Sequence, residues 1–458
     1  MTLRYCPGCF EKQRRINELE EQVVRLKEKL RYQERTAKEG FFGSSTPSSK
    51  IPIKPNTLAQ RQERKGGAKV GHVGHGRSSL APSQADSVET IRTGNSCPHC
   101  GSALEHKGTR SRTVIDYTPA KIVTRTYLLE HKHCPRCGRT VEADAPGVLP
   151  KSLFSNQLLS NLAGQHYAEG RPLGQIEGAT GLGIGSLIAG FHHLARRLKD
   201  VPEKLLLEYR AEPVKHADET GWRTDGQNGY AWLFCTPRIS LFRFRKTRSG
   251  EVVKEVFGQK RLPGTLVVDR YAGYNRARCR IQYCYAHLLR AVEDVAKQFP
   301  GNTEIEAFVG RLAPLLGTAM HLRGLPVSDK EFHRRAAQTR GQIVEAIHQQ
   351  ARHPAIQNIQ SIFRENAHRL YHWAADRRIP ADNNLAERNL RSLVIARKIS
   401  FGSQSDEGAK TREILMTVLH TLKKRTANPA QALAAVLDKL AADPGIDLYE
   451  QLFRLDTS

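Results

Sequence analysis

The stretch from residue 213 to residue 275 decides how this chain folds. It reads PVKHADET (213–220), GYAWLFCT (229–236), SLFRFRK (240–246), VVKEVFG (252–258) and PGTLVVDRYAGYN (263–275). The first three segments have the apolar and β-branched residues of strands and are joined by short polar turns, whereas the fourth has helical spacing. The fifth is a short apolar run that ends in Asp269. We therefore predict three strands, a helix and a fourth strand, which is an α/β arrangement.

This order of elements is that of the ribonuclease-H fold, in which the first strand carries an acidic residue at mid-sheet and the fourth ends in another. Asp218 and Asp269 occupy these two places. Either residue alone is more often a turn-forming or helix-capping aspartate, but the two together in this order predict a metal site. Glu219 is a rival for Asp218, and strand alternation places the two side chains on opposite faces.

A third acidic residue is expected on a helix that packs across the sheet. Residues from Phe299 to about Trp373 are largely helical and are predicted to be an insertion, and IPADNNLAERNLRSLVIARK follows at 379–398. Asn383 is a candidate N-cap for this helix, and Glu387 lies in its first turn. An alternative is that Glu387 and Arg391 form a solvated i,i+4 ion pair.

The charge balance predicts a nucleic-acid partner. The chain has 71 Lys and Arg against 46 Asp and Glu, a net charge of +25, with 39% hydrophobic residues. Such an excess is usually neutralised by phosphate, although a merely soluble basic protein is the alternative. The candidate phosphate contacts are Arg243, Arg245, Lys246, Arg248, Arg388 and Arg391. No apolar run approaches the roughly 18–20 residues of a membrane span, and the start lacks the apolar core of a signal peptide, so we expect a cytoplasmic protein without a membrane partner.

Six of the nine cysteines fall in CxxC pairs, which is a metal-binding pattern. Cys97 and Cys100 precede, and Cys134 and Cys137 follow, two strand-like segments. A structural Zn²⁺ ion is bound by four ligands in a tetrahedron, and these two CxxC pairs supply four thiolates. The pattern therefore predicts a zinc ribbon here. His133 is an alternative ligand, and the pair at positions 6 and 9 (CPGC) is a further candidate metal site.

The N-terminal segment predicts a helix with an apolar seam. The seam residues repeat at spacings of three and four: Ile16, Leu19, Val23, Leu26 and Leu30. This is an a/d pattern about two heptads long. It predicts a short coiled coil that pairs protomers, or else an amphipathic helix that packs on its own protein.

The chain therefore divides into segments of different character. They are an N-terminal CxxC and coiled-coil helix (1–39), a flexible basic linker (40–90), the zinc ribbon (91–148), a helical segment (149–208), an α/β domain (209–430) with a helical insertion at about 300–375, and a helical tail (431–458). The linker is rich in Gly, Ser, Pro and positive charge. The segment 149–208 has the pattern of a DNA-reading helix-turn-helix, or equally of a bundle that supports the next domain.

Five motifs in one order carry a family resemblance. They are DETGWR (218–223), DRYAGYN (269–275), CYAHLLR (284–290), NNLAERNLR (383–391) and FGSQSDEGAKT (401–411). Together with the N-terminal helix, the GHVGH linker at 71–75 and the CxxC pairs, they resemble the DDE transposases of the insertion sequence 66 family. The resemblance covers essentially the whole chain. It implies a ribonuclease-H-like domain in which Asp218, Asp269 and Glu387 are the catalytic triad.

The resemblance also implies a chemistry and partners. The three carboxylates would hold two Mg²⁺ or Mn²⁺ ions, cut transposon terminal inverted repeats and join them to target DNA. A homo-oligomer and small companion proteins of the same element are implied partners. His287 is expected either to orient substrate or a metal-bound water or to be a structural histidine, and Trp222 either to stack on a DNA base or to pack in the core. Alternatives are a nuclease that cuts without joining, and a zinc-ribbon DNA-binding protein without catalysis.

Overall fold

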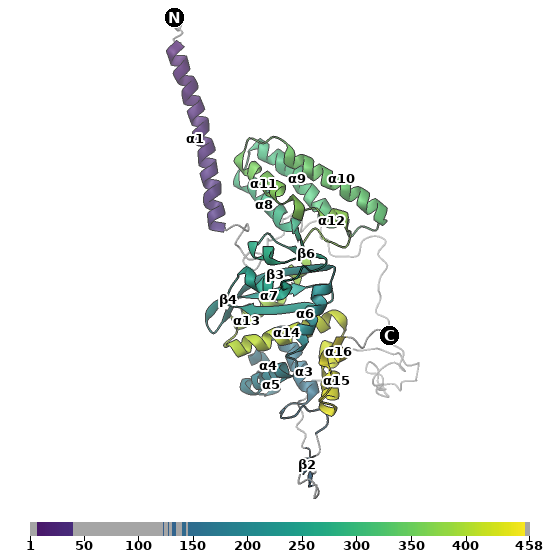
Figure 1. Ribbon diagram of the computed structural model, residues 1–458. Coiled ribbons are helices and arrows are strands. Elements are labelled where there is room, and N and C mark those ends of the chain that lie inside the picture. The colour runs from purple at the N-terminus through teal and green to yellow at the C-terminus, as the bar shows by residue number, and fades with distance from the viewer. Residues whose placement is uncertain are drawn as a thin grey trace, which may run out of the picture. The chain divides into compact units, whose positions relative to one another are not determined.

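The structure is a computed structural model that describes residues 7–39, 122, 127, 131–133, 140–142 and 145–453 (Figure 1). The predicted linker and the four zinc-ribbon cysteines lie outside these described residues. β1 (His131–His133) and β2 (Thr140–Glu142) pair antiparallel. Within the described part of the chain, every helix is too short or too polar to span a lipid bilayer.

The larger part of the structure is built on a five-stranded sheet. Its strands are β3 (Val214–Thr224), β4 (Gln227–Cys235), β5 (Ser240–Arg245), β6 (Thr265–Val268) and β7 (Arg280–Tyr283). They lie in the order β5-β4-β3-β6-β7, with β3, β4 and β5 antiparallel and β6 and β7 parallel to β3. α7 (Gly250–Phe257) connects β5 to β6. The α/β class is confirmed, with one mixed sheet in a chain that is mostly helical.

The two faces of the sheet carry different partners. On one face Trp232 and Phe234 are fully buried, and their rings lie against Tyr274 and Phe257. On the other face lie α13 (Asn384–Ser400) and α14 (Asp406–Arg425). α14 is fixed to the edge strand because the Phe242 backbone N–H donates to the Thr417 hydroxyl at 3.0 Å. Side chains on successive residues of β3 therefore face different surroundings.

A helical segment precedes the sheet and packs beneath α14. It contains α3 (Asn156–Ala163), the π-helix η3 (Gly164–Ala168), α4 (Leu173–Thr180), α5 (Ile184–Arg197) and α6 (Val201–Ala211). In α5, Leu187 and Leu194 are fully buried, and His192 lies 2.6 Å from the Thr411 hydroxyl of α14. The segment thus supports the helix that covers the sheet, and a DNA-reading role for it stays a prediction.

A second group of helices follows β7 and includes the region, about 300–375, that is predicted to be an insertion. It contains α8 (Tyr285–Gln298), α9 (Thr303–Leu322), α10 (Asp329–His348), α11 (Pro354–Glu365), the short η5 (Ala367–Arg369) and α12 (His372–Ala375). These helices pack on one another (Figure 1). The chain ends in α15 (Pro429–Ala442) and α16 (Leu448–Phe453), which pack together.

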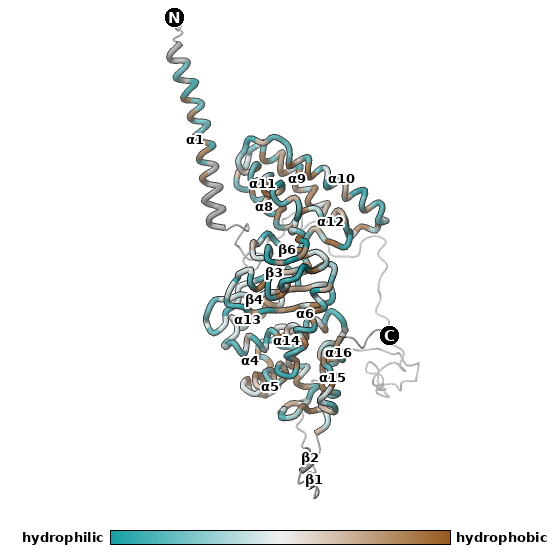
Figure 2. Tube along the Cα trace, in the orientation of Figure 1, coloured by the Kyte–Doolittle hydropathy of each residue, from teal (hydrophilic) through white to brown (hydrophobic). Residues whose placement is uncertain are grey.

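The N-terminal helix α1 spans Pro7–Glu39, and hydrophobic positions recur among hydrophilic ones in its middle part (Figure 2). The five predicted seam residues are 44–63% exposed. The helix is therefore present as expected, and its apolar seam is accessible in the single chain.

Candidate active site

Asp218 lies in the interior of β3, on the face covered by α13. The strand continues beyond it to Thr224 because β3 and β4 form a long hairpin through Asp225 and Gly226, both at positive φ. One Asp218 carboxylate oxygen accepts the backbone N–H of Glu219 at 2.9 Å. The other carboxylate oxygen has no such backbone restraint among the contacts of the described residues.

Asp269 follows directly on β6, which pairs in parallel with β3. The register sets His216 opposite Val267, so two residues further along the strands Asp218 comes opposite Asp269. The Asp269 carboxylate accepts the backbone N–H of Tyr271 at 2.9 Å, which fixes it at the end of the strand. The sheet thus brings the two predicted aspartates side by side.

Glu387 reaches the same place from the first turn of α13. Asn383, the residue just before α13, is 1% exposed. Its side-chain oxygen accepts a hydrogen bond from His216 Nδ1 at 2.9 Å. Its amide nitrogen donates to the Ala217 carbonyl at 2.8 Å. Asn383 is at the N-cap position as expected, but its side chain binds β3 instead of capping the helix. This bond pair holds the start of α13 beside the residue that precedes Asp218.

The electrostatics agree with this grouping. Burial, and next the charge of Glu219, raise the pKa of Asp218 well above its usual range. The charges of Asp269 and Glu387 raise the pKa of Asp218 further. Burial and the charge of Glu219 also raise the pKa of Asp269 to about 7. Partly buried carboxyls that repel one another are the setting in which a bound cation is most favourable.

Glu219 is directed to the other face of the sheet, as strand alternation predicted. Its side chain is 2% exposed and accepts two hydrogen bonds from Arg248, at 2.9 and 2.6 Å. It also accepts a hydrogen bond from the Tyr274 hydroxyl. The Arg248 guanidinium in turn lies 4.3 Å from the centre of the Tyr271 ring. Glu219 therefore has a cationic partner of its own, whereas within the described residues no ion pair is found for the Asp218 carboxylate.

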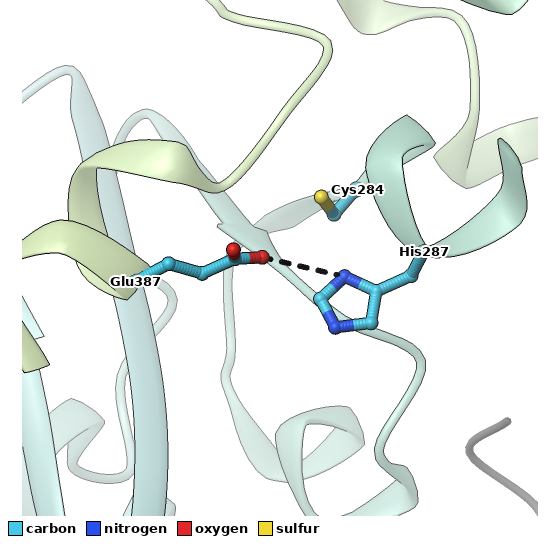
Figure 3. A group of neighbouring side chains, drawn as sticks. All are labelled: Cys284, His287 and Glu387. Atoms are coloured by element: carbon cyan, nitrogen blue, oxygen red, sulfur yellow. Dashed lines mark ion pairs between the residues drawn. The ribbon is translucent and has the colours of Figure 1, made fainter. Parts of the chain in front are cut away.

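Glu387 has a second set of neighbours at the junction of β7 and α8. Figure 3 shows His287 and Glu387 pointing toward each other, with Cys284 beside them. His287 Nδ1 lies 3.8 Å and an Arg290 guanidinium nitrogen 3.5 Å from the same Glu387 oxygen. Burial, and then the charges of Arg290 and Arg270, lower the pKa of His287 to about 3, so this imidazole is neutral.

The potential ligand atoms of Cys284, His287 and Glu387 all lie within 4.8 Å of one another. Within the described ranges, no other three His, Cys, Asp or Glu residues meet this criterion. The carboxylates of Asp218, Asp269 and Glu387 are thus less tightly grouped than the ligands of one ion. A pair of ions about 3.5–4 Å apart spreads its ligands over a wider span than a single ion does.

The candidate phosphate contacts divide into paired and exposed residues. Arg243 is 2% exposed and lies between Glu203, at 2.9 Å, and the buried Glu413, at 3.6 Å. Arg245 binds Glu413 at 2.8 Å and also Glu255. Both arginines therefore join the sheet to its helices. Arg243 is buried and Arg245 is 28% exposed, and carboxylates engage both guanidinium groups, so we leave these two out of the proposed functional surface.

The other candidates lie on the surface or at the site. Lys246, Arg388 and Arg391 are exposed. Arg248 binds Glu219 next to the aspartates. Trp222 is 2% exposed, 5.1 Å from the Phe244 ring and 5.2 Å from the Arg412 guanidinium. Of the two expectations for Trp222, core packing fits this position.

Two contacts of the site were not predicted from the sequence. The bond from Asn383 to β3 joins residues 167 positions apart, so no local pattern shows it. The Arg290–Glu387 pair could have been suspected, because Arg290 follows His287 by three residues and shares its face of α8.

Comparison with known proteins identifies the family. The family model described as transposase IS66 family matches residues 151–411, more than half of the 458 residues. The zinc-finger binding domain of transposase IS66 matches residues 95–138, which include all four predicted zinc ligands. This second match supports the predicted Zn²⁺ and a DNA-binding role.

Two relatives come from Sinorhizobium fredii (strain NBRC 101917 / NGR234). Uncharacterized protein y4jD is 23% identical over 387 residues, 76% of this chain and 75% of the relative. Uncharacterized protein y4qI is 25% identical over 344 residues, 66% of this chain and 62% of the relative. The chain thus spans most, but not all, of the length of these relatives. On the family match, this chain belongs to the IS66 family of transposases.

Proposed function

We propose that this transposase is a DDE enzyme in which Asp218, Asp269 and Glu387 hold a pair of divalent cations at the DNA strand to be cut. The observation that carries the proposal is the parallel register of β3 and β6, which pairs His216 with Val267 and, when continued by two residues, brings Asp218 toward Asp269. The bonds from Asn383 to β3 bring the first turn of α13, with Glu387, to the same place. These contacts support the proposal that three carboxylates far apart in sequence gather around β3.

The sheet supports assignment to a ribonuclease-H-like fold. Three antiparallel strands are followed by a helix and by two strands parallel to the first. One acidic residue lies within the first strand and one directly follows the fourth, as that fold requires. α13 then supplies the third acidic residue from the face opposite Glu219.

The donor atoms at the proposed site fit Mg²⁺ or Mn²⁺. All three side chains offer oxygen, the donor that these hard cations prefer. When bound, a pair of such ions stabilises the charge on the attacking and leaving oxygens of an in-line phosphoryl displacement. Asp218 and Asp269, from adjacent strands, and Glu387, from α13, would hold the pair of ions. Burial and the charge of Glu219 raise the pKa of Asp269, and a bound cation would favour the ionised form of this carboxyl.

The test is cleavage and strand transfer with labelled element ends in Mg²⁺. Asp269→Asn and Glu387→Gln should each lower both activities by at least about a hundredfold, because one metal ligand is lost. Binding to the same ends should persist, since neither carboxylate attracts phosphate. Glu293→Gln is the matched control, because Glu293 is an exposed carboxylate on α8.

The outcomes separate the alternatives. Full activity of Asp269→Asn would exclude Asp269 from the metal site, and wild-type chain that binds the ends without cutting them would be a DNA-binding protein without catalysis. Cleavage without joining by the wild-type chain would identify a nuclease instead.

We assign DNA backbone contact to Arg388 and Arg391, with Lys246 as a further contact. Arg388 and Arg391 are exposed on α13, the helix that carries Glu387, so a strand lying at Glu387 passes within reach of both. Arg388 also lines a cavity of about 610 Å³ together with Lys423. Contacts of this kind position DNA without reading its sequence.

A further inference from the structure

The group formed by Cys284, His287 and Glu387 differs chemically from the three proposed catalytic carboxylates. Its donors are one sulfur, one imidazole nitrogen and one carboxylate oxygen, all within 4.8 Å of one another (Figure 3). Mg²⁺ rarely takes sulfur or nitrogen ligands, whereas Zn²⁺ is bound by all three types. Only Glu387 belongs to both sets.

Two of the three ligands are held in place before any ion arrives. Cys284 is fully buried at the start of α8, and its sulfur accepts the backbone N–H of Asn383 at 3.1 Å. His287 is one turn further along the same helix, so its position relative to Cys284 is fixed by helix geometry. The start of α8 therefore holds the backbones of Cys284 and His287 at a fixed distance from each other.

His287 offers an unsatisfied ligand atom. Its Nδ1 is buried and makes no hydrogen bond, and a Glu387 oxygen lies 3.8 Å from it. A buried polar atom without a partner is costly, and a metal ion between it and Glu387 would remove that cost.

Arg290 is the group that an ion would displace. Its guanidinium lies 3.5 Å from the Glu387 oxygen, but its side chain is 51% exposed and can turn into solvent. Ligand atoms about 2.0–2.3 Å from one Zn²⁺ in a tetrahedron lie roughly 3–4 Å from one another, and the 3.8 Å between His287 Nδ1 and the Glu387 oxygen falls in that range.

We propose that Cys284, His287 and Glu387 bind one Zn²⁺, separate from the zinc finger, and that this ion inhibits catalysis by withdrawing Glu387 from the Mg²⁺ site. The binding half stands on the residues just described. The inhibition half rests on the proposed role of Glu387.

The binding half is tested on the full chain by counting zinc. Wild type, Cys284→Ser, His287→Ala and the control Cys279→Ser are saturated with Zn²⁺, desalted and analysed for metal per folded chain. Cys279 is a matched control because it is a cysteine five residues before Cys284 that is outside the group. Cys284→Ser and His287→Ala should each hold one zinc fewer than wild type, and Cys279→Ser the same number.

Affinity gives a second measurement of the same site. Zinc affinity is measured by titration against a chromogenic zinc chelator. Because loss of an outer-shell partner alone lowers metal affinity roughly 10–100-fold, His287→Ala, which loses a ligand, should bind zinc at this site at least that much more weakly than wild type. His287 is 26% exposed, so this variant should fold, which circular dichroism verifies. A folded His287→Ala with wild-type zinc content and affinity would overturn the proposal.

The inhibition half is tested by adding Zn²⁺ to the Mg²⁺-dependent cleavage assay. Wild type should lose cleavage as the site fills, and in His287→Ala the inhibitory concentration should rise at least about tenfold relative to its own uninhibited rate. Equal inhibition of both proteins would refute this half. If wild type cleaves nothing in Mg²⁺, the proposed function fails while the zinc count still decides the site.

Discussion

At the scale of single residues, Asn383 links the sheet to the helix that carries Glu387. One buried amide satisfies His216 Nδ1 and the Ala217 carbonyl, both on the strand of Asp218. Its own backbone N–H is satisfied by the Cys284 sulfur. The position of Glu387 therefore depends on a buried residue that is not one of the proposed metal ligands.

Asn383→Ala should lower the free energy of unfolding by about 1–3 kcal/mol, because two buried polar groups lose their partner. It should also lower Mg²⁺-dependent cleavage, since the start of α13 is released from β3. Urea unfolding and the cleavage assay measure the two effects. Asn384→Ala, at the exposed next position, is the control, and equal behaviour of the two variants would refute the role of Asn383.

Sequence reasoning at this scale succeeded where the pattern was local. The apolar runs before Asp218 and Asp269 and the face of Glu219 all follow from strand alternation. Sequence reasoning failed where the role of a residue depends on a partner that is distant in the sequence. Arg243 reads as an exposed basic residue until Glu413, 170 positions away, is placed beside it.

At the scale of elements, the strands and helices of residues 213–298 could be predicted because each has a clear period and a turn at its end. The course of the helical insertion could not be predicted. Its packing depends on contacts such as that between Gln282 and the Leu370 carbonyl, which join the sheet to the far end of the insertion.

The N-terminal helix allows a test of self-association. Its apolar seam is exposed in the single chain, and burying it in a second copy would recover about 1.5–3 kcal/mol per large side chain. Leu26→Glu should therefore weaken the oligomer at least tenfold, as measured by sedimentation at several concentrations.

Val24→Glu is the matched control for this change. Val24 is 57% exposed on the same helix but lies outside the seam. Unchanged mass for Leu26→Glu, or equal loss in Val24→Glu, would contradict a coiled coil built on the seam.

At the scale of the whole molecule, the effect of the net charge of +25 depends on which of the charged side chains are exposed. Part of the positive charge is internal, as with Arg243, and contributes nothing to DNA binding. The exposed pair Arg388 and Arg391 on α13 does face solvent. The charge that matters for DNA is therefore smaller than the total and is concentrated on particular elements.

Arg388→Ala and Arg391→Ala should each weaken DNA binding at low salt and reduce the slope of log affinity against log salt by about one, because one phosphate contact is lost. Binding titrations at several salt concentrations measure this slope. Lys330→Ala, an exposed cation on α10, should leave the slope unchanged. An unaltered slope in both arginine variants would exclude α13 from the DNA interface.

The helical insertion leaves and rejoins the sheet at one point. At that point the Tyr285 N–H donates to the Ala381 carbonyl at 2.8 Å, and two residues later the Asn383 N–H meets the Cys284 sulfur. These two contacts hold together the two ends of the long helical segment between Tyr285 and Ala381. Segments spliced into its outer loops, or removed from them, would leave the three carboxylates in register, so the transposase has a place where its chain can grow or shrink while the chemistry stays in place.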